Sequence, residues 1–156
     1  MDMDEAWTNV VRALMTGSGN FHKKIIEFKA CDSEWLAYLK EKLSSKDRGV
    51  AISVLGTLTN EELQTLFDKL VYLGSFNHGG LDFIHELILR LPKAWVLENI
   101  RRYTEPILEK GDEDEYRRLL ELFYLLDPDM TRELAKRAQQ HSDPGIREAG
   151  DDFIDG

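Results

Sequence analysis

Two stretches of the sequence decide how the fold is read: KDRGVAISVLGTL at residues 46–58 and SDPGIREAGDDFI at residues 142–154. Each opens with a short turn containing Asp and Gly and continues with apolar residues at helical spacing. Aligning the two identifies five equivalent positions, Phe21, Val50, Leu81, Tyr116 and Ile146, at intervals of 29, 31, 35 and 30 residues. Self-similarity at about 30 to 45 residues per helical pair is typical of α-solenoids, so the sequence predicts repeated helical hairpins.

Prolines and capping residues mark the starts of the predicted helices. Asp127-Pro128 and Asp143-Pro144 each combine an N-cap with a first-turn proline, and residues 59–62 form a capping box. Between these signals apolar residues recur every three or four positions, without a period-two run that would indicate strands. The predicted helices are residues 4–16, 20–30, 33–44, 47–58, 60–74, 78–91, 93–110, 113–127, 129–141 and 144–155.

Residues 142–154 resemble the second helix of a HEAT repeat, with Asp143 and Pro144 in the turn and Arg147 at its usual place. Residues 46–58 are similar but lack the arginine, and the copies between them are more degenerate. The resemblance implies an all-α protein, specifically a right-handed α-solenoid of about five antiparallel helical hairpins of the HEAT-like or ARM-like kind. It says more about architecture than about activity.

Length and composition favour one cytoplasmic domain spanning residues 1–156. The single cysteine, Cys31, cannot form an internal disulfide and has no zinc or redox motif around it. The first residues, MDMDEAW, are acidic where a secretory signal is basic, and no run approaches the roughly twenty apolar residues of a membrane span. We therefore expect no membrane partner.

The net charge of −9 is unevenly distributed along the chain. Residues 1–78 carry 9 basic and 11 acidic side chains, whereas residues 79–156 carry 11 and 18, which gives net charges of −2 and −7. A field of this sign repels nucleic acid and favours encounter with basic partners. A negative net charge also keeps many proteins soluble, so it is weak evidence for a basic partner.

The sequence shows no equipment for catalysis. His78, Asp82 and His85 have a spacing that could place them on one helix face, but the set is incomplete as a metal site, and capping or surface histidines are expected instead. No serine lies in a nucleophile elbow, and Gly17-Ser18-Gly19 lacks the strand and lysine of a phosphate loop. We expect a protein without cofactor or metal that is not an enzyme.

Two charged clusters allow more than one interpretation. The acidic run at residues 112–115 is either a recognition patch or a helix N-terminus stabilised by the dipole and by pairs with Arg117 and Arg118. The pairs Arg101-Arg102 and Arg117-Arg118 could hold a phosphate. Some HEAT-like proteins are DNA glycosylases for alkylated bases with a basic concave surface, and the acidic charge of this chain departs from that pattern.

Burial is predicted most clearly for the helix that begins near Glu115. Its apolar residues, expected to be buried, are Tyr116, Leu119, Leu120, Leu122, Phe123 and Leu126. Trp7 and Trp35 are predicted to lie in the core, while the place of Trp95 is left open.

The resulting hypothesis is a protein–protein interaction module. The second helices of HEAT-like hairpins usually line the concave side, so we expect an acidic concave face that binds a basic partner protein. The residues expected to contact the partner are Asp82, Glu86, Glu113, Arg117, Arg118, Glu121, Tyr124, Arg147, Asp151 and Asp152. A bacterial immunity-type inhibitor of a toxin is one form of this function. The alternatives are a scaffold or adaptor subunit, a chaperone-like lyase subunit of the repeat type, and the glycosylase.

Overall fold

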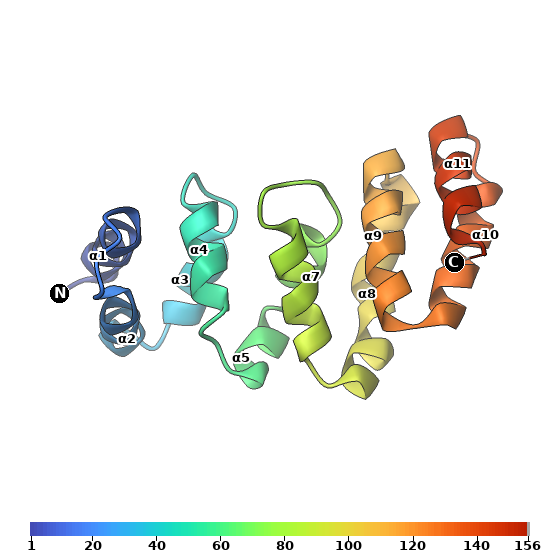
Figure 1. Ribbon diagram of the computed structural model, residues 1–156. Helices are drawn as coiled ribbons and strands as arrows, with labels where there is room; N and C mark the ends of the chain where they lie inside the picture. The colour runs from blue at the N-terminus through green and yellow to red at the C-terminus, as the bar shows by residue number, and fades with distance from the viewer. Residues whose placement is uncertain (156) are drawn as a thin grey trace. The chain divides into compact units, whose positions relative to one another are not determined.

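The computed structural model describes residues 1–155, which contain eleven α-helices and no strand (Figure 1). The prediction of an all-α protein is therefore confirmed. The chain divides into two compact units, unit 1 at Met1–Glu62 and unit 2 at Leu63–Gly156, and each is described by itself. The single domain over residues 1–156 stays a prediction.

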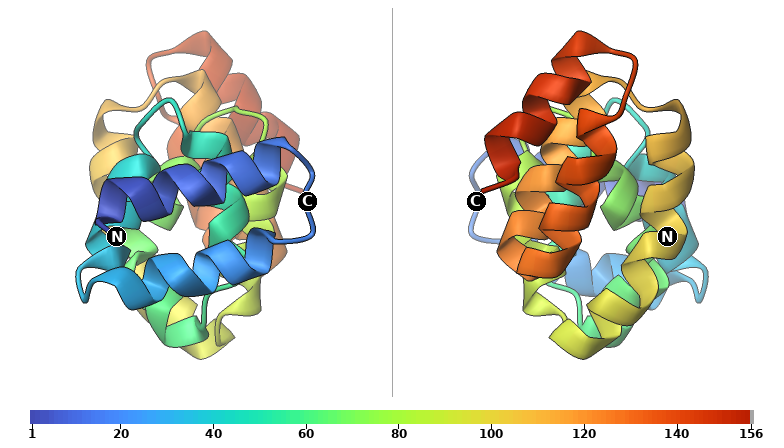
Figure 2. Two further views of the ribbon diagram at one scale, coloured as in Figure 1. Left: turned by 90° about the vertical axis from the view of Figure 1, so that its left-hand side faces the viewer. Right: turned by 90° about the vertical axis from the view of Figure 1, so that its right-hand side faces the viewer.

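Unit 1 contains four complete helices, α1 (Met3–Met15), α2 (Phe21–Cys31), α3 (Trp35–Lys42) and α4 (Arg48–Leu55). Helices α1 and α2 lie antiparallel and side by side (Figure 2, left), and α2 and α4 both contact α3. The core is aromatic where α1 meets α2, because the buried rings of Trp7 and Phe28 lie 5.4 Å apart. The indole Nε1 of Trp7 donates a hydrogen bond to Asp47 Oδ2 at 3.0 Å, which satisfies its polar atom.

The tryptophan predictions are confirmed for one residue and only partly correct for another. Trp7 is buried as predicted, whereas Trp35 is half-buried. Trp35 is the first residue of α3, so only part of its ring reaches Phe28, at 6.2 Å between ring centroids. The ammonium of Lys29 lies 5.1 Å from the ring centroid, an arrangement that suits a partly solvated indole.

Helix α5 (Asn60–Thr65) spans the boundary between the units, and the capping box at its start is confirmed. Thr59 Oγ1 accepts from the Glu62 N–H at 3.2 Å, and Glu62 Oε1 accepts from the Thr59 N–H at 2.9 Å. The predicted single helix at 60–74 is wrong, because the chain breaks at Leu66. The Leu66 N–H bonds to the Leu63 carbonyl, a tighter turn than the α-helical one. Apolar spacing continues across this break, so periodicity could not reveal it.

Unit 2 contains α6 (Phe67–Leu73), α7 (Leu81–Arg90), α8 (Lys93–Lys110), α9 (Glu113–Leu126), α10 (Pro128–Gln139) and α11 (Pro144–Phe153). Helices α7, α9 and α11 contact one another in succession and form one layer (Figure 1). Helices α6, α8 and α10 form the second layer. The half-buried Trp95 of α8 packs edge-on against Phe67 of α6 at 4.8 Å, and Arg137 of α10 bonds Glu105 of α8 at 2.7 Å.

Helix α9 is the centre of unit 2. It contacts α7, α8, α10 and α11, so apolar side chains are needed around most of its circumference. All six of its residues that were predicted to be buried are buried. Its N-terminus has a capping box in which Asp112 Oδ1 accepts from the Glu115 N–H at 3.0 Å, and Glu115 Oε1 accepts from the Asp112 N–H at 3.2 Å.

Helices α10 and α11 pack closely as an antiparallel pair (Figure 2, right). Their predicted N-caps are confirmed, since Asp127 accepts from the Met130 N–H at 3.0 Å and Asp143 from the Gly145 N–H at 2.7 Å. Gly150 allows the close approach, because a Cβ there would lie 2.6 Å from the Ala135 carbonyl oxygen of α10.

Candidate functional site

All ten residues predicted to bind a partner lie in unit 2, and none of them is buried. Helix α7 carries Asp82 and Glu86, α9 carries Glu113, Arg117, Arg118, Glu121 and Tyr124, and α11 carries Arg147, Asp151 and Asp152. Because α7, α9 and α11 form one layer, these side chains belong to neighbouring helices. We refer to the non-buried charged side chains of this layer as the acidic face.

Charge is separated between the two layers of unit 2. Helix α7 has two acidic residues and one basic residue, α9 has four acidic and two basic residues, and α11 has three acidic residues and one basic residue. Their net charges are −1, −2 and −2. In the other layer, α6 has one residue of each sign, α8 has three acidic and four basic, and α10 has two and three. The net charges of α6, α8 and α10 are therefore 0, +1 and +1. The negative potential of unit 2 is therefore strongest over the acidic face.

Arg117 joins α9 to α11 through two carboxylates. Its Nε bonds Glu113 Oε1 at 3.0 Å, and its Nη1 bonds Asp152 Oδ2 at 2.9 Å. The hydrogen bond that Arg117 donates to Asp152 is the main cause that raises the pKa of Arg117 above its usual value. These three predicted site residues are therefore brought together, with one positive charge between two negative ones and a net charge of −1.

Arg118 lies between two further carboxylates of α9. Its Nη2 is 3.4 Å from Glu121 Oε1, and its Nε is 3.5 Å from Asp114 Oδ1. The Nε atom is buried, and within the described residues no acceptor lies in hydrogen-bonding geometry to it. The second oxygen of Asp114 accepts from the Asn77 N–H at 2.8 Å, which fixes the loop before α7.

The acidic run at residues 112–115 thus has a structural role, because all four carboxylates have partners inside the chain. Two of them form the capping box of α9, and Glu113 and Asp114 form the ion pairs with the arginines. Of three pairs that the i, i+4 spacing predicts, Glu113–Arg117 and Asp114–Arg118 are confirmed. The third, Arg117–Glu121, is wrong, because Glu121 pairs with Arg118 and Arg117 with Asp152.

The carboxylates of α7 differ from those of α9. Asp82 and Glu86 are exposed, and neither forms an ion pair within residues 1–155. On α11, Asp151 accepts from Gln139 Nε2 at 2.9 Å, and Arg147 Nη1 donates to two backbone carbonyls of the preceding loop at 2.8 and 3.0 Å. Among the predicted residues, Asp82 and Glu86 are the carboxylates most available to an external cation.

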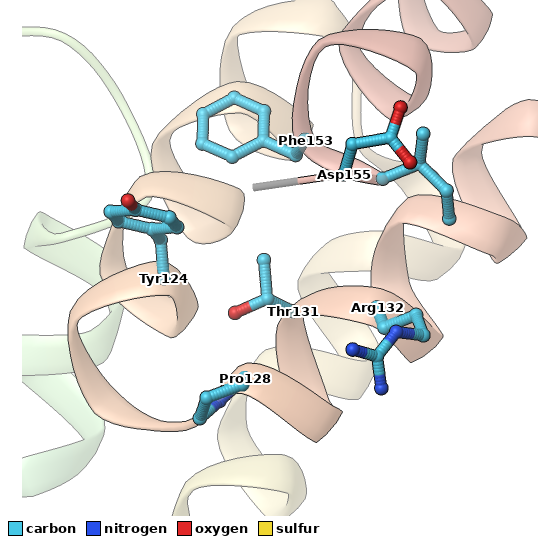
Figure 3. Close-up of a pocket in the computed structure, with 7 residues that line it drawn as sticks. Tyr124, Pro128, Thr131, Arg132, Phe153 and Asp155 are labelled. Atoms are coloured by element: carbon cyan, nitrogen blue, oxygen red, sulfur yellow. The ribbon is translucent and has the colours of Figure 1, made fainter.

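A hollow of about 580 Å³ opens where α9 and α11 end and α10 begins (Figure 3). Its lining consists of Tyr124, Pro128, Thr131, Arg132, Phe153, Ile154 and Asp155. The rings of Tyr124 and Phe153 meet edge to face, 6.4 Å apart. The sequence predicted only Tyr124 as a site residue, because the other lining residues come from two other segments, 128–132 and 153–155, and share no spacing that links them to it.

The histidines considered for a metal site serve as capping groups instead. His78 Nε2 bonds the Leu73 carbonyl at 2.7 Å, while its Nδ1 accepts from the Gly80 N–H at 3.1 Å. The buried His85 bonds the Gly74 carbonyl through Nε2 at 2.8 Å. Both rings thereby satisfy carbonyls at the end of α6. Within the described residues, no group of three His, Cys, Asp or Glu side chains could hold a metal ion.

The arginine pairs considered for phosphate binding hold partners within the protein. Arg101 bonds Glu133 at 2.8 Å and Arg102 donates to Asn99 at 3.1 Å, while Arg117 and Arg118 face carboxylates. A phosphate would have to displace these partners before it could bind.

Comparison with protein-family models, with curated proteins and with solved structures finds no match for this chain. None of the helices in residues 1–155 has the combination of length and apolar character that crossing a membrane requires. The function is therefore argued from the geometry and charge of unit 2.

Proposed function

We propose that the protein is a non-catalytic interaction module of the helical-repeat type whose acidic face binds a basic partner protein. The observation that carries the proposal is the separation of charge between the layers, acidic on α7, α9 and α11 and neutral to slightly basic on α6, α8 and α10. The proposal extends these alternating layers to a right-handed α-solenoid of about five hairpins, in which the acidic face is concave.

The proposal assigns the first contact with the partner to α7. Asp82 and Glu86 are exposed and unpaired, so a lysine or arginine of the partner can approach them without breaking an internal ion pair. The carboxylates bound to Arg117 and Arg118 contribute to the field, but each already has an arginine partner that an external cation would have to replace. Electrostatic attraction of this kind speeds association and weakens as salt is added.

A narrower form of the proposal is an inhibitor of the bacterial immunity type that neutralises a basic toxin. The size of 156 residues and the net charge of −9 support it, because a small acidic protein can cover a basic active surface without chemistry of its own. A scaffold subunit would use the same face to hold a component of a larger assembly.

The test compares two double variants of equal charge. Asp82→Lys/Glu86→Lys reverses the charge of α7, and Glu98→Lys/Glu109→Lys does the same at two exposed, unpaired carboxylates of α8. Each changes the net charge from −9 by four units. Tagged wild-type protein is used to isolate a partner from a lysate, and the affinity of the purified pair is then measured at about 50 mM and about 300 mM salt.

We expect the α7 variant to lose about tenfold or more in affinity at low salt, and the α8 control to lose less than about threefold, because only the former places repulsive charge in the contact. The difference should shrink at high salt. Equal losses in both variants, or a partner that is itself acidic, would remove the proposal.

A further inference from the structure

The hollow at the ends of α9 and α11 exposes apolar surface where those helices are otherwise well packed. Tyr124, which lines the hollow, is 53% exposed, although α9 is buried over most of its length. The next residue, Leu125, is 55% exposed but lies outside the lining. Figure 3 shows Tyr124 and Phe153 on one side of the opening, with Pro128 and Thr131 below them. The volume of about 580 Å³ lies within the range of ligand pockets, roughly 300 to 1,000 Å³.

The charges around the hollow favour a cation beside it. Arg132 is paired with Asp129 at 3.2 Å, whereas Asp155 is exposed and forms no ion pair within the described residues. Neither α9 nor α11 has a basic residue in its last turn, so the negative ends of both helix dipoles are uncompensated there. The opposite, positive end of α10 is already capped by Asp127.

The hollow is also continuous with the acidic face. Tyr124 lies one turn after Glu121 on α9, and Phe153 directly follows Asp152 on α11. A recess with two aromatic rings in a mixed polar and apolar lining, bordered by negative charge, matches a segment in which one aromatic side chain lies between basic residues. The two aromatic walls favour an aromatic ring over an aliphatic chain, because ring edges and faces attract each other.

We propose that this hollow receives an aromatic side chain, flanked by lysine or arginine, from the basic partner. The inference rests on the proposed function for the nature of the partner, and it adds the anchor that gives the complex its specificity. Anchors of this kind, aromatic residues in a recess surrounded by weaker contacts, carry most of the affinity in many protein interfaces.

The test uses two fluorescent peptides of equal charge, Lys-Lys-Trp-Lys-Lys and Lys-Lys-Ala-Lys-Lys, with binding followed by anisotropy. We expect the full chain to bind the tryptophan peptide about tenfold more tightly, a typical effect of one buried aromatic anchor. Tyr124→Ala should reduce this preference to about twofold or less. Leu125→Ala removes an equally exposed apolar residue of the same helix that does not line the hollow, and it should leave the preference unchanged.

Further variants separate this inference from the proposed function. Asp155→Lys should weaken both peptides by a similar factor, because it reverses one charge of the lining and leaves the rings of Tyr124 and Phe153 in place. Equal binding of the two peptides, no binding of either at about 1 mM, or a preference that survives Tyr124→Ala would overturn the hollow as an anchor site. If the protein keeps its preference for the tryptophan peptide but the affinity of the partner does not respond to the α7 charge reversal, the proposed role of the acidic face is overturned. The hollow then remains as an anchor site. Circular dichroism confirms that each variant is folded.

Discussion

Gly150 of α11 lies against the backbone of α10, and the substitution Gly150→Ala should destabilise the protein. An added Cβ would lie 2.6 Å from the Ala135 carbonyl oxygen, 2.9 Å from the Gln139 nitrogen and 3.0 Å from the Ala138 Cβ. Ordinary contacts begin near 3.4 Å, so α11 would have to move away from α10 by several tenths of an ångström. No side-chain rotation can relieve the clash, because two of the three obstacles are backbone atoms.

Two opposing effects set the magnitude. Overpacking of this kind costs about 1–3 kcal/mol, whereas Ala in place of Gly within a helix gains up to about 1 kcal/mol. We expect a net loss of about 1–2 kcal/mol, which corresponds to a decrease in Tm of roughly 2–8 °C for a chain of this size. Urea unfolding followed by far-UV circular dichroism measures the free energy, and a thermal scan measures Tm.

Gly49→Ala is the matched control, because it places the same methyl group in a helix where no atom lies within 4 Å. Only the helix propensity changes there, so the control should stabilise the protein by up to about 1 kcal/mol. Since Gly49 lies in unit 1 and Gly150 in unit 2, separate unfolding transitions would each respond to one variant. If Gly150→Ala stabilises as much as the control, then α10 and α11 do not pack as closely as described.

Two further predictions concern polar contacts in unit 2. His85→Leu should cost about 1–3 kcal/mol in urea unfolding, because the Gly74 carbonyl would lose the donor that lies 2.8 Å away in a buried site; an unchanged midpoint would show that water replaces the ring. Arg117→Met should cost about 0.5–1 kcal/mol at low salt and less at about 1 M salt, because its partly exposed ion pairs with Glu113 and Asp152 are screened; a salt-independent cost would indicate lost packing instead.

Helix starts could be predicted well because they depend on local chemistry. Asp127 and Asp143 cap their helices in the structure as the sequence indicates, and the capping box at residues 59–62 forms with both of its hydrogen bonds. The break at Leu66 could not be predicted, since the apolar residues keep the same face on both sides of it. Local turn geometry, and not hydrophobic period, ends α5.

The sequence could predict which charged residues belong to the candidate site, but not which of them bond to one another between helices. Spacing alone indicates that Arg117 can pair with Glu113 four residues earlier, but its bond to Asp152 depends on how α9 packs against α11. The hollow could not be predicted either, because Phe153 lines it only when α11 packs beside Tyr124 of α9. Charge counts by helix became informative only after the two layers of unit 2 were known.

The enclosure of α9 by four other helices constrains how this chain could evolve in length. A helix with one side in water tolerates polar residues there, whereas α9 contacts helices on several sides and is apolar around most of its circumference. Deletion of α10 and α11 would expose the apolar side chains of α9 that they cover, and the exposed surface would favour aggregation. Loss of α10 and α11 would therefore require compensating polar substitutions on the side of α9 that they cover.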